Sequence, residues 1–203
     1  MEKNGVYTYN LSTGLLGNKR RLILAPDYLE YENSPLQSSP FTRINKEDIV
    51  DIKHDLEFIL WYRFYVGCDF TLDVKSQDGH ILSVRFKSYF SKNDSYREIY
   101  AKIVDIIWDY YLSGLVEKWK ERLFAKKSVE LKDVLLTEEG VFLLDQQYLI
   151  YWEDVEVKEY NDYYAVFSKS QPVYNKILRY NEWGSEVLYS LATSLTKGRE
   201  EKE

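Results

Sequence analysis

Cysteine and histidine are scarce in this chain of 203 residues, which contains one Cys and two His. A single thiol, Cys68, forms no disulfide within the chain, so a disulfide scaffold is excluded. A zinc site needs three or four His, Cys or carboxylate ligands at defined spacing, and His54 and His80 lie far apart in the sequence. We therefore expect no metal site, no cofactor and an inert thiol.

The chain also lacks the glycine motifs of common enzyme classes. It has 9 Gly, and none of them lies in a G-x-S-x-G, G-x-x-x-x-G-K-[ST] or G-x-G-x-x-G pattern. Serine-hydrolase, phosphate-loop and dinucleotide-binding mechanisms therefore lose their usual support.

Long apolar runs are missing as well. The most apolar windows, 58–67 and 99–115, are interrupted by charged residues and fall short of the ~20 apolar residues that span a membrane. The first residues, Met1 to Gly5, show no basic segment followed by an apolar one, so we expect no secretory signal and a cytoplasmic location.

Positive charge is in deficit, because 27 Lys+Arg face 33 Asp+Glu for a formal net charge of −6. Affinity for nucleic acids depends on basic surface that neutralises phosphates, so the composition weakens that function. Apolar residues make up 45% and aromatic residues 16% of the chain, which suffices for a folded core. The length fits one large domain or two small ones.

Up to about residue 90 the chain shows the period-2 alternation of half-buried strands. The apolar positions of three such runs are Val50, Ile52, Leu56 and Phe58; Phe70, Leu72 and Val74; and Leu82, Val84 and Phe86. His54 falls on the apolar face of the first run, which is typical of a hydrogen-bonded core histidine. Asp78-Gly79 supplies the positive φ angles of a tight turn, so we expect an antiparallel hairpin and an exposed His80.

A helix is expected from Ser95, because Ser95 and Glu98 fit a capping box. Its apolar stripe consists of Ile99, Ile103, Ile106 and Tyr110. Beyond Gly114 the stripe moves about one residue out of phase, to Leu112, Val116, Trp119 and Leu123. We expect the helix to bend near Gly114 or to turn a second face to new neighbours.

The second half of the chain repeats the first in the same order. The matching segments are 22–29 with 134–141, 47–49 with 153–155, and 75–77 with 169–171. The second copy shows only about five strands before its closing helix, whose stripe is Trp183, Val187, Leu191 and Leu195. We predict two domains and a tail: residues 1–127 with a long connector helix, an abbreviated unit at 128–197, and a disordered tail at 198–203.

Consecutive antiparallel strands closed by one C-terminal helix resemble the pleckstrin-homology-like (PH-like) superfold, in particular small bacterial PH-like and GRAM-like domains. The resemblance is carried by Leu22 to Tyr31, Ile49 to Phe58, the hairpin from Phe70 to Phe86, the helix from Ser95, and their counterparts from Val134 to Leu195. It implies an α+β protein of two PH-like units, each an antiparallel strand barrel or sheet closed by a C-terminal helix, that binds or scaffolds.

The family places lipid-binding Lys and Arg residues between its first two strands, where this chain has Lys19, Arg20 and Arg21. The resemblance thus implies a lipid-headgroup site. The net charge of −6 favours a solvated strand start instead, and a membrane partner is not expected.

Two acidic pairs, Glu138-Glu139 and Glu153-Asp154, are nominal candidates for glycosidase-type acid and base. Adjacent side chains on a strand point to opposite faces, and Glu138-Glu139-Gly140 is typical of a turn. We therefore name no catalytic residue, and a hydrolase with an unrecognised carboxylate site stays an alternative.

Aromatic side chains gather at equivalent joints of the two copies. Phe58 lies in the first joint, and the residues that we assign to partner binding are Trp61, Tyr62, Phe64 and Tyr65 in the first copy and Tyr160, Tyr163 and Tyr164 beside Asn161-Asp162 in the second. Aromatic residues with a polar handle are enriched at interfaces, and the alternative is that they complete the core or join the two copies. We interpret the chain as a non-catalytic binding or scaffolding module for a protein or peptide partner, or for a second copy of itself. A hydrolase and a lipid-surface adaptor are the alternatives.

Overall fold

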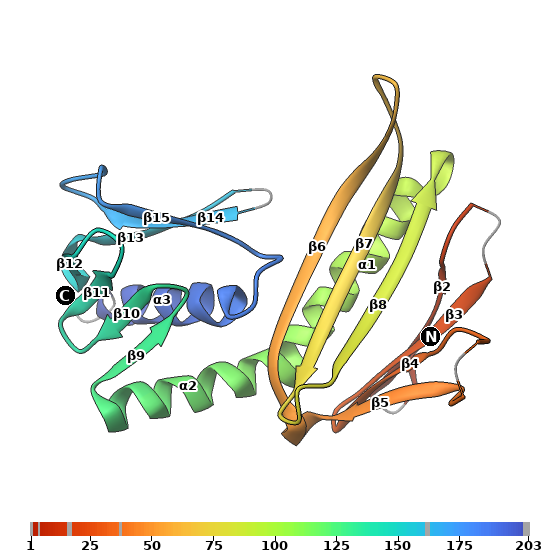
Figure 1. Ribbon diagram of the computed structural model, residues 1–203, viewed down its shortest axis with the longest axis horizontal. Helices are drawn as coiled ribbons and strands as arrows, with labels where there is room; N and C mark the ends of the chain where they lie inside the picture. Colours follow the sequence, from red (N-terminus) through yellow and green to blue (C-terminus); the bar gives the residue numbers. More distant parts are fainter. Residues whose placement is uncertain (1, 4, 16–17, 37, 161–162, 201–203) are drawn as a thin grey trace. The chain divides into compact units, whose positions relative to one another are not determined.

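The computed structural model describes residues 2–3, 5–15, 18–36, 38–160 and 163–200. The fold is α+β with four antiparallel sheets (Figure 1). The chain divides into two compact units, Met1–Ser113 and Gly114–Glu203, called unit 1 and unit 2 below. This division falls inside the long helical segment, whereas the sequence places the domain boundary after residue 127.

Unit 1 contains two sheets followed by a helix. The first sheet consists of β1 (Glu2–Lys3), β2 (Val6–Ser12), β3 (Lys19–Ala25), β4 (Tyr28–Glu32) and β5 (Phe41–Asn45). A short 3-10 turn, η1 (Lys46–Asp48), leads to the second sheet of β6 (Ile49–Trp61), β7 (Phe64–Ser76) and β8 (Ile81–Tyr89). Another 3-10 turn, η2 (Phe90–Lys92), precedes helix α1 (Asn93–Ile107).

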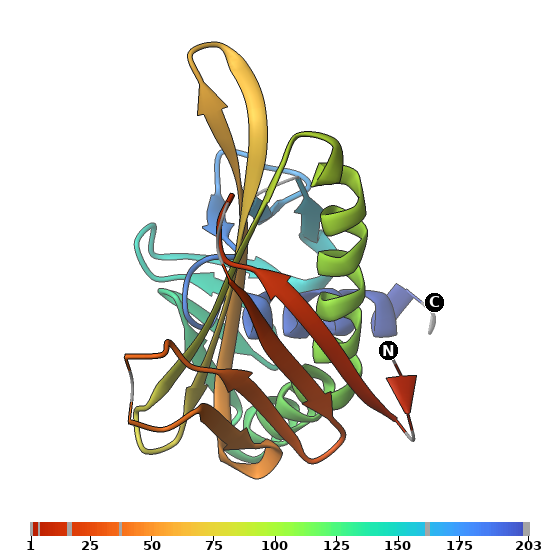
Figure 2. The ribbon, with the colours of Figure 1, turned by 90° about the vertical axis from the view of Figure 1, so that its right-hand side faces the viewer.

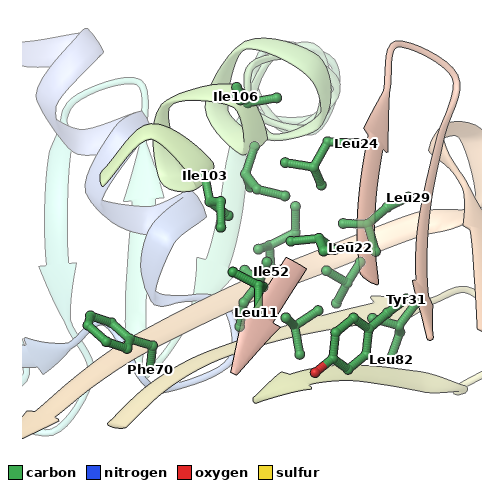
Figure 3. Close-up of a cluster of buried hydrophobic side chains, with 14 of the residues drawn as sticks. Leu11, Leu22, Leu24, Leu29, Tyr31, Ile52, Phe70, Leu82, Ile103 and Ile106 are labelled. Carbon is green, nitrogen blue, oxygen red and sulfur yellow. The ribbon is translucent and has the colours of Figure 1, made fainter. Parts of the chain in front are cut away.

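The core of unit 1 lies between its two sheets and α1, as Figure 3 shows. Its alternating strand positions are buried as the period-2 pattern predicts, among them Leu22, Leu24, Ile52, Phe70, Leu82 and Ile103. The phenol of Tyr111 donates to the carbonyl oxygens of Ala25 at 2.7 Å and Tyr28 at 2.6 Å. The helical segment is thereby fixed to the β3–β4 turn.

The helix start predicted at Ser95 is wrong by two residues. Helix α1 begins at Asn93, and its N-cap position, Lys92, has no side-chain capping bond. Ser95 therefore lies inside the first turn, because η2 already brings the chain into a helical conformation before the expected cap. The stripe itself is confirmed, since Ile103 and Ile106 are buried.

The shift of the apolar stripe near Gly114 has a structural cause. A π-helical segment, η3 (Trp108–Leu112), lies between α1 and helix α2 (Ser113–Lys126). A π turn holds one residue more than an α turn, so the faces before and after it differ by about one position. The sequence predicts an irregularity here, and the structure identifies it as a π segment.

One expected core position is exposed because of a β-bulge. Ile49 pairs with Ser76 and Asp51 pairs with Lys75, which leaves Val50 as an extra residue on β6. A bulge re-aims the side chain at the inserted position. Val50 is accordingly exposed, while Ile52 stays buried.

Unit 2 contains α2, two sheets and a closing helix. The four-stranded sheet consists of β9 (Ser128–Leu131), β10 (Val134–Thr137), β11 (Gly140–Leu143) and β12 (Tyr148–Tyr151). After the 3-10 turn η4 (Trp152–Asp154), a three-stranded sheet consists of β13 (Val155–Glu159), β14 (Tyr163–Ser168) and β15 (Asn175–Arg179). Helix α3 (Ser185–Glu200) follows.

Two sequence predictions for unit 2 are wrong. Its described residues form seven strands rather than about five, because strands of four residues are too short to show alternation. Residues 198–200 continue α3, where a disordered tail was expected, and residues 201–203 of that tail lie outside the described residues.

The two units share a local geometry at the start of their three-stranded sheets. The backbone N–H of Gln77 donates to the backbone carbonyl oxygen of Asp48 at 2.8 Å. In unit 2, the backbone N–H of Lys169 donates to the backbone carbonyl oxygen of Asp154 at 2.8 Å. Lys169 is thus the structural counterpart of Gln77. The sequence comparison had matched Gln77 with Gln171 instead, because both segments contain the triplet Lys-Ser-Gln, so its alignment of this hairpin was wrong by two residues.

Candidate functional site

The β6–β7 hairpin extends beyond the rest of unit 1 (Figures 1 and 2). The two strands pair with each other as far as Trp61 and Phe64, whereas the pairing of β7 with β8 ends at Gly67 and Tyr89. Beyond that point the hairpin is a two-stranded ribbon without a covering third strand. We call residues 58–66 the apolar tip.

The side chains of the apolar tip are exposed on both faces of the ribbon. Leu60 pairs with Tyr65 and Trp61 pairs with Phe64, and neighbouring pairs point to opposite faces. The exposed fractions are 52% for Phe58, 59% for Leu60, 64% for Trp61, 90% for Tyr62, 75% for Phe64 and 70% for Tyr65. Isolated exposed apolar residues are ordinary, but such a contiguous cluster marks an interaction surface.

The turn of the apolar tip places its most exposed side chain at the end of the hairpin. Tyr62 has a φ of +56°, a left-handed conformation that bulky residues rarely adopt and that costs on the order of 1–2 kcal/mol. Arg63 follows it and is exposed.

Sequence reasoning assigned Trp61, Tyr62, Phe64 and Tyr65 to this surface, and it placed Phe58 in the same aromatic joint but also on the apolar face of its strand. The ring of Phe58 instead contacts Tyr65, with centroids 5.2 Å apart, and both are exposed. Leu60 was missed. The unbroken apolar run of residues 58–62 was a usable signal, because a half-buried strand would alternate with polar residues.

The equivalent hairpin of unit 2 is less exposed. The rings of Tyr160 and Tyr163 stack with centroids 4.6 Å apart, and Tyr160 is exposed. Tyr164 does not belong to this surface, because adjacent strand residues point to opposite faces. Its side chain is fully buried, and its phenol donates to the backbone carbonyl oxygen of Ser185 at 2.8 Å. The predicted loop Asn161-Asp162 lies outside the described residues.

The three residues of the basic cluster, Lys19, Arg20 and Arg21, have different surroundings. The Arg21 guanidinium lies over the Phe41 ring at 4.8 Å. Lys19 and Arg20 line a pocket of about 450 Å³ that also contains Glu32. The arrangement does not concentrate positive charge for an anionic headgroup.

Another pocket, of about 500 Å³, lies between the β2–β3 loop and the start of α1. Its lining includes Lys19, Lys87 and Lys92 together with serine hydroxyls. The ammonium of Lys87 is paired with the Asp69 carboxylate at 2.5 Å, and this partner raises the pKa of the lysine. The pocket therefore offers less free positive charge than its three lysines indicate.

The acidic pairs named from sequence do not converge. Glu138 and Glu139 lie exposed between β10 and β11. Asp154 accepts from the Ser168 hydroxyl and from the Ser170 N–H at 2.8 Å, and the hydroxyl bond lowers its pKa. An ionised carboxylate held in a turn has no proton to donate as a general acid.

Two other carboxylates share a pocket of about 400 Å³ beside the β7–β8 turn. Asp78 accepts from the Ser76 hydroxyl and from the His80 N–H at 3.0 Å, and the hydroxyl bond lowers its pKa. Asp48 accepts from the Gln77 amide at 2.6 Å. Both carboxylates serve local turns, and His80 is exposed as predicted.

The remaining reactive side chains have structural surroundings. Nδ1 of His54 lies 2.8 Å from the Tyr100 phenol oxygen, which confirms a hydrogen-bonded histidine. Cys68 is buried, and burial raises the pKa of its thiol, which suppresses the reactive thiolate. Within the described ranges, no group of three or more His, Cys, Asp or Glu could hold a metal ion.

Comparisons with protein-family models, curated proteins and solved structures found no match to this chain. In the part of the chain that the structure describes, no helix has both the length and the apolar character required to cross a membrane.

Proposed function

We propose that this chain is a non-catalytic binding module for a protein or peptide partner and that it docks through the apolar tip. The observation that carries the proposal is the exposure of six large apolar side chains on both faces of one protruding hairpin. Aromatic anchors of this kind dominate the binding energy of protein interfaces.

A PH-like architecture for both units is part of the proposal. Four strands, then three strands, then a helix occur in that order as β2–β5, β6–β8 and α1, and again as β9–β12, β13–β15 and α3. The equivalent backbone hydrogen bonds that Asp48 accepts in unit 1 and Asp154 accepts in unit 2 support a duplication. Folds of this kind carry sites on their loops and hairpins, which is consistent with docking through the apolar tip.

The alternatives have weaker support. A hydrolase needs acidic side chains that converge with a group able to hold a proton, and the carboxylates at Asp78 and Asp154 are engaged in turns that lower their pKa. A lipid-surface adaptor needs unpaired basic side chains, whereas Lys19 and Arg20 share their pocket with Glu32 and the Arg21 guanidinium lies over the Phe41 ring.

The proposal is tested by truncating two anchors of the apolar tip. Trp61→Ala with Tyr65→Ala should keep the melting temperature within a few degrees while partner capture from the native host is lost, because interface anchors typically cost about 2 kcal/mol or more when removed. Leu36→Ala is the matched control, since Leu36 is 96% exposed and distant in sequence from the apolar tip. Unchanged capture by the double variant, or strong destabilisation of it, would contradict the proposal.

A further inference from the structure

The two faces of the apolar tip present equivalent apolar character. Leu60 and Tyr65 occupy one face, and Trp61 and Phe64 occupy the other. Docking on a flat surface would bury one of these pairs and leave the other in water. Burial of both pairs requires a partner that surrounds the ribbon.

A lipid bilayer surrounds an inserted ribbon but fits this one poorly. To bury all residues from Tyr62 to Phe58, the ribbon would have to enter the bilayer to a depth of about 13 Å, at 3.3 Å per residue. This depth exceeds the ~5–10 Å reached by interfacial anchors. The ribbon has no third strand there, so its outer backbone groups would enter hydrocarbon unpaired.

Charge at the base of the apolar tip also disfavours a membrane. Glu57 pairs across the ribbon with Asp69, directly below Phe58. Full insertion would bring the Glu57 carboxylate to the level of anionic headgroups, which repel it, whereas the Asp69 carboxylate is paired with Lys87. A protein cleft can instead supply hydrogen-bond partners to the ribbon edges.

Arg63 indicates one polar feature of the partner. It is the one charged residue in the sequence of the apolar tip, and it follows Tyr62 in the turn. A guanidinium keeps its charge under all ordinary conditions, and a buried charge requires a paired counter-charge. An acid at the end of the cleft that receives the turn would supply that counter-charge to Arg63.

We infer that the partner is a protein with a two-walled apolar cleft, which takes the apolar tip between its walls and offers a carboxylate to Arg63. This inference rests on the proposed function, because it specifies the chemistry of the partner that docks there. Each wall contacts one face of the ribbon.

The test places a photoreactive benzoyl-phenylalanine at one position at a time in the full chain, expressed in the native host. It replaces Trp61 on one face, Tyr65 on the other and, as the control, Ile81, which is exposed at the far end of the same sheet. The inference expects positions 61 and 65 to cross-link to the same protein, and position 81 to give no such product.

The possible failures are distinguishable. Cross-linking from only one face overturns the two-walled cleft but leaves the proposed function standing. A product of two copies of this chain, or flotation of the purified chain with phosphatidylcholine vesicles, overturns the inference in favour of self-association or a membrane. No product from either face contradicts the proposed function itself.

The carboxylate is tested with the cross-linked protein after its purification. Arg63→Gln should weaken binding at least about tenfold, because it removes one partner of a buried charge pair, and Arg63→Lys should restore part of the loss. Equal affinities for all three chains would overturn the acidic feature of the cleft. Circular dichroism of the variants checks that the fold is intact.

Discussion

Truncation of Phe64 to alanine should leave unit 1 almost as stable as the unchanged chain, whereas the same truncation at Phe70 on the same strand should be severe. Phe70 is 0% exposed, and Phe64 is 75% exposed. An aromatic side chain buries about 150–250 Å², so at about 25 cal/mol per Å² full burial contributes about 4–6 kcal/mol. Only a quarter of the Phe64 side chain is buried, so its burial contributes about 1 kcal/mol.

Urea unfolding of the full chain measures the difference. Large-to-small truncation of a buried Phe costs about 3–5 kcal/mol, and with a slope of about 2 kcal/mol per M the midpoint for Phe70→Ala should fall by roughly 1.5–2.5 M. The transition that moves in this variant identifies unit 1. Phe64→Ala should shift the same transition by about 0.5 M or less. A shift as large as that of Phe70→Ala would refute the reasoning, because the apolar tip would then be part of a core.

Three further outcomes are expected. Gly140→Ala should lower the melting temperature of unit 2, because the new Cβ would lie 2.0 Å from the Ile150 oxygen and force β11 and β12 apart; an unchanged melt by circular dichroism would contradict this. The Ser168 hydroxyl lowers the pKa of Asp154, so the stabilisation is present above the unfolded pKa of about 4 and is lost as pH falls through the folded value. Asp154→Asn should therefore destabilise the chain at pH 7 more than at pH 3 in thermal melts, and an equal difference at both would count against it. A fragment of residues 1–113, which ends where unit 1 ends, should be soluble and melt cooperatively, and an insoluble or molten fragment would show that the two halves share a core.

Local patterns predicted the elements whose causes are local. A turn forms at Asp78-Gly79 as expected, but only Gly79 has a positive φ, at +84°, which glycine adopts without steric cost. The α1 stripe faces the core as its spacing predicts, with Ile103 and Ile106 buried. These features depend on a few neighbouring residues and on no distant contact.

Features that depend on pairing between strands were missed. The bulge at Val50 comes from the register between β6 and β7, which no single strand encodes. The four-residue strands of unit 2 are recognisable only through their partners.

The start of helix α1 was missed for a different reason. Ser95 matches a capping box, yet η2 begins the helical conformation earlier.

The sequence by itself determined the limits of the chemistry and the position of the aromatic residues. One Cys and two His leave few ligands and nucleophiles, and the apolar run at residues 58–62 places a concentrated hydrophobic segment on a strand. Composition and spacing are properties of the chain before it folds.

Only the tertiary structure decided which part of that hairpin is core and which part is surface. Phe70 and Phe58 both continue an apolar alternation, but Phe70 stacks on Phe86 of β8 with centroids 4.7 Å apart and contacts Tyr100 of α1 at 5.1 Å, while Phe58 contacts the exposed Tyr65 at 5.2 Å. The β7–β8 pairing stops at Gly67, so the ribbon beyond it has no third strand to pack against. Burial is a property of what lies across the sheet, and the residues that supply it come from elsewhere in the chain.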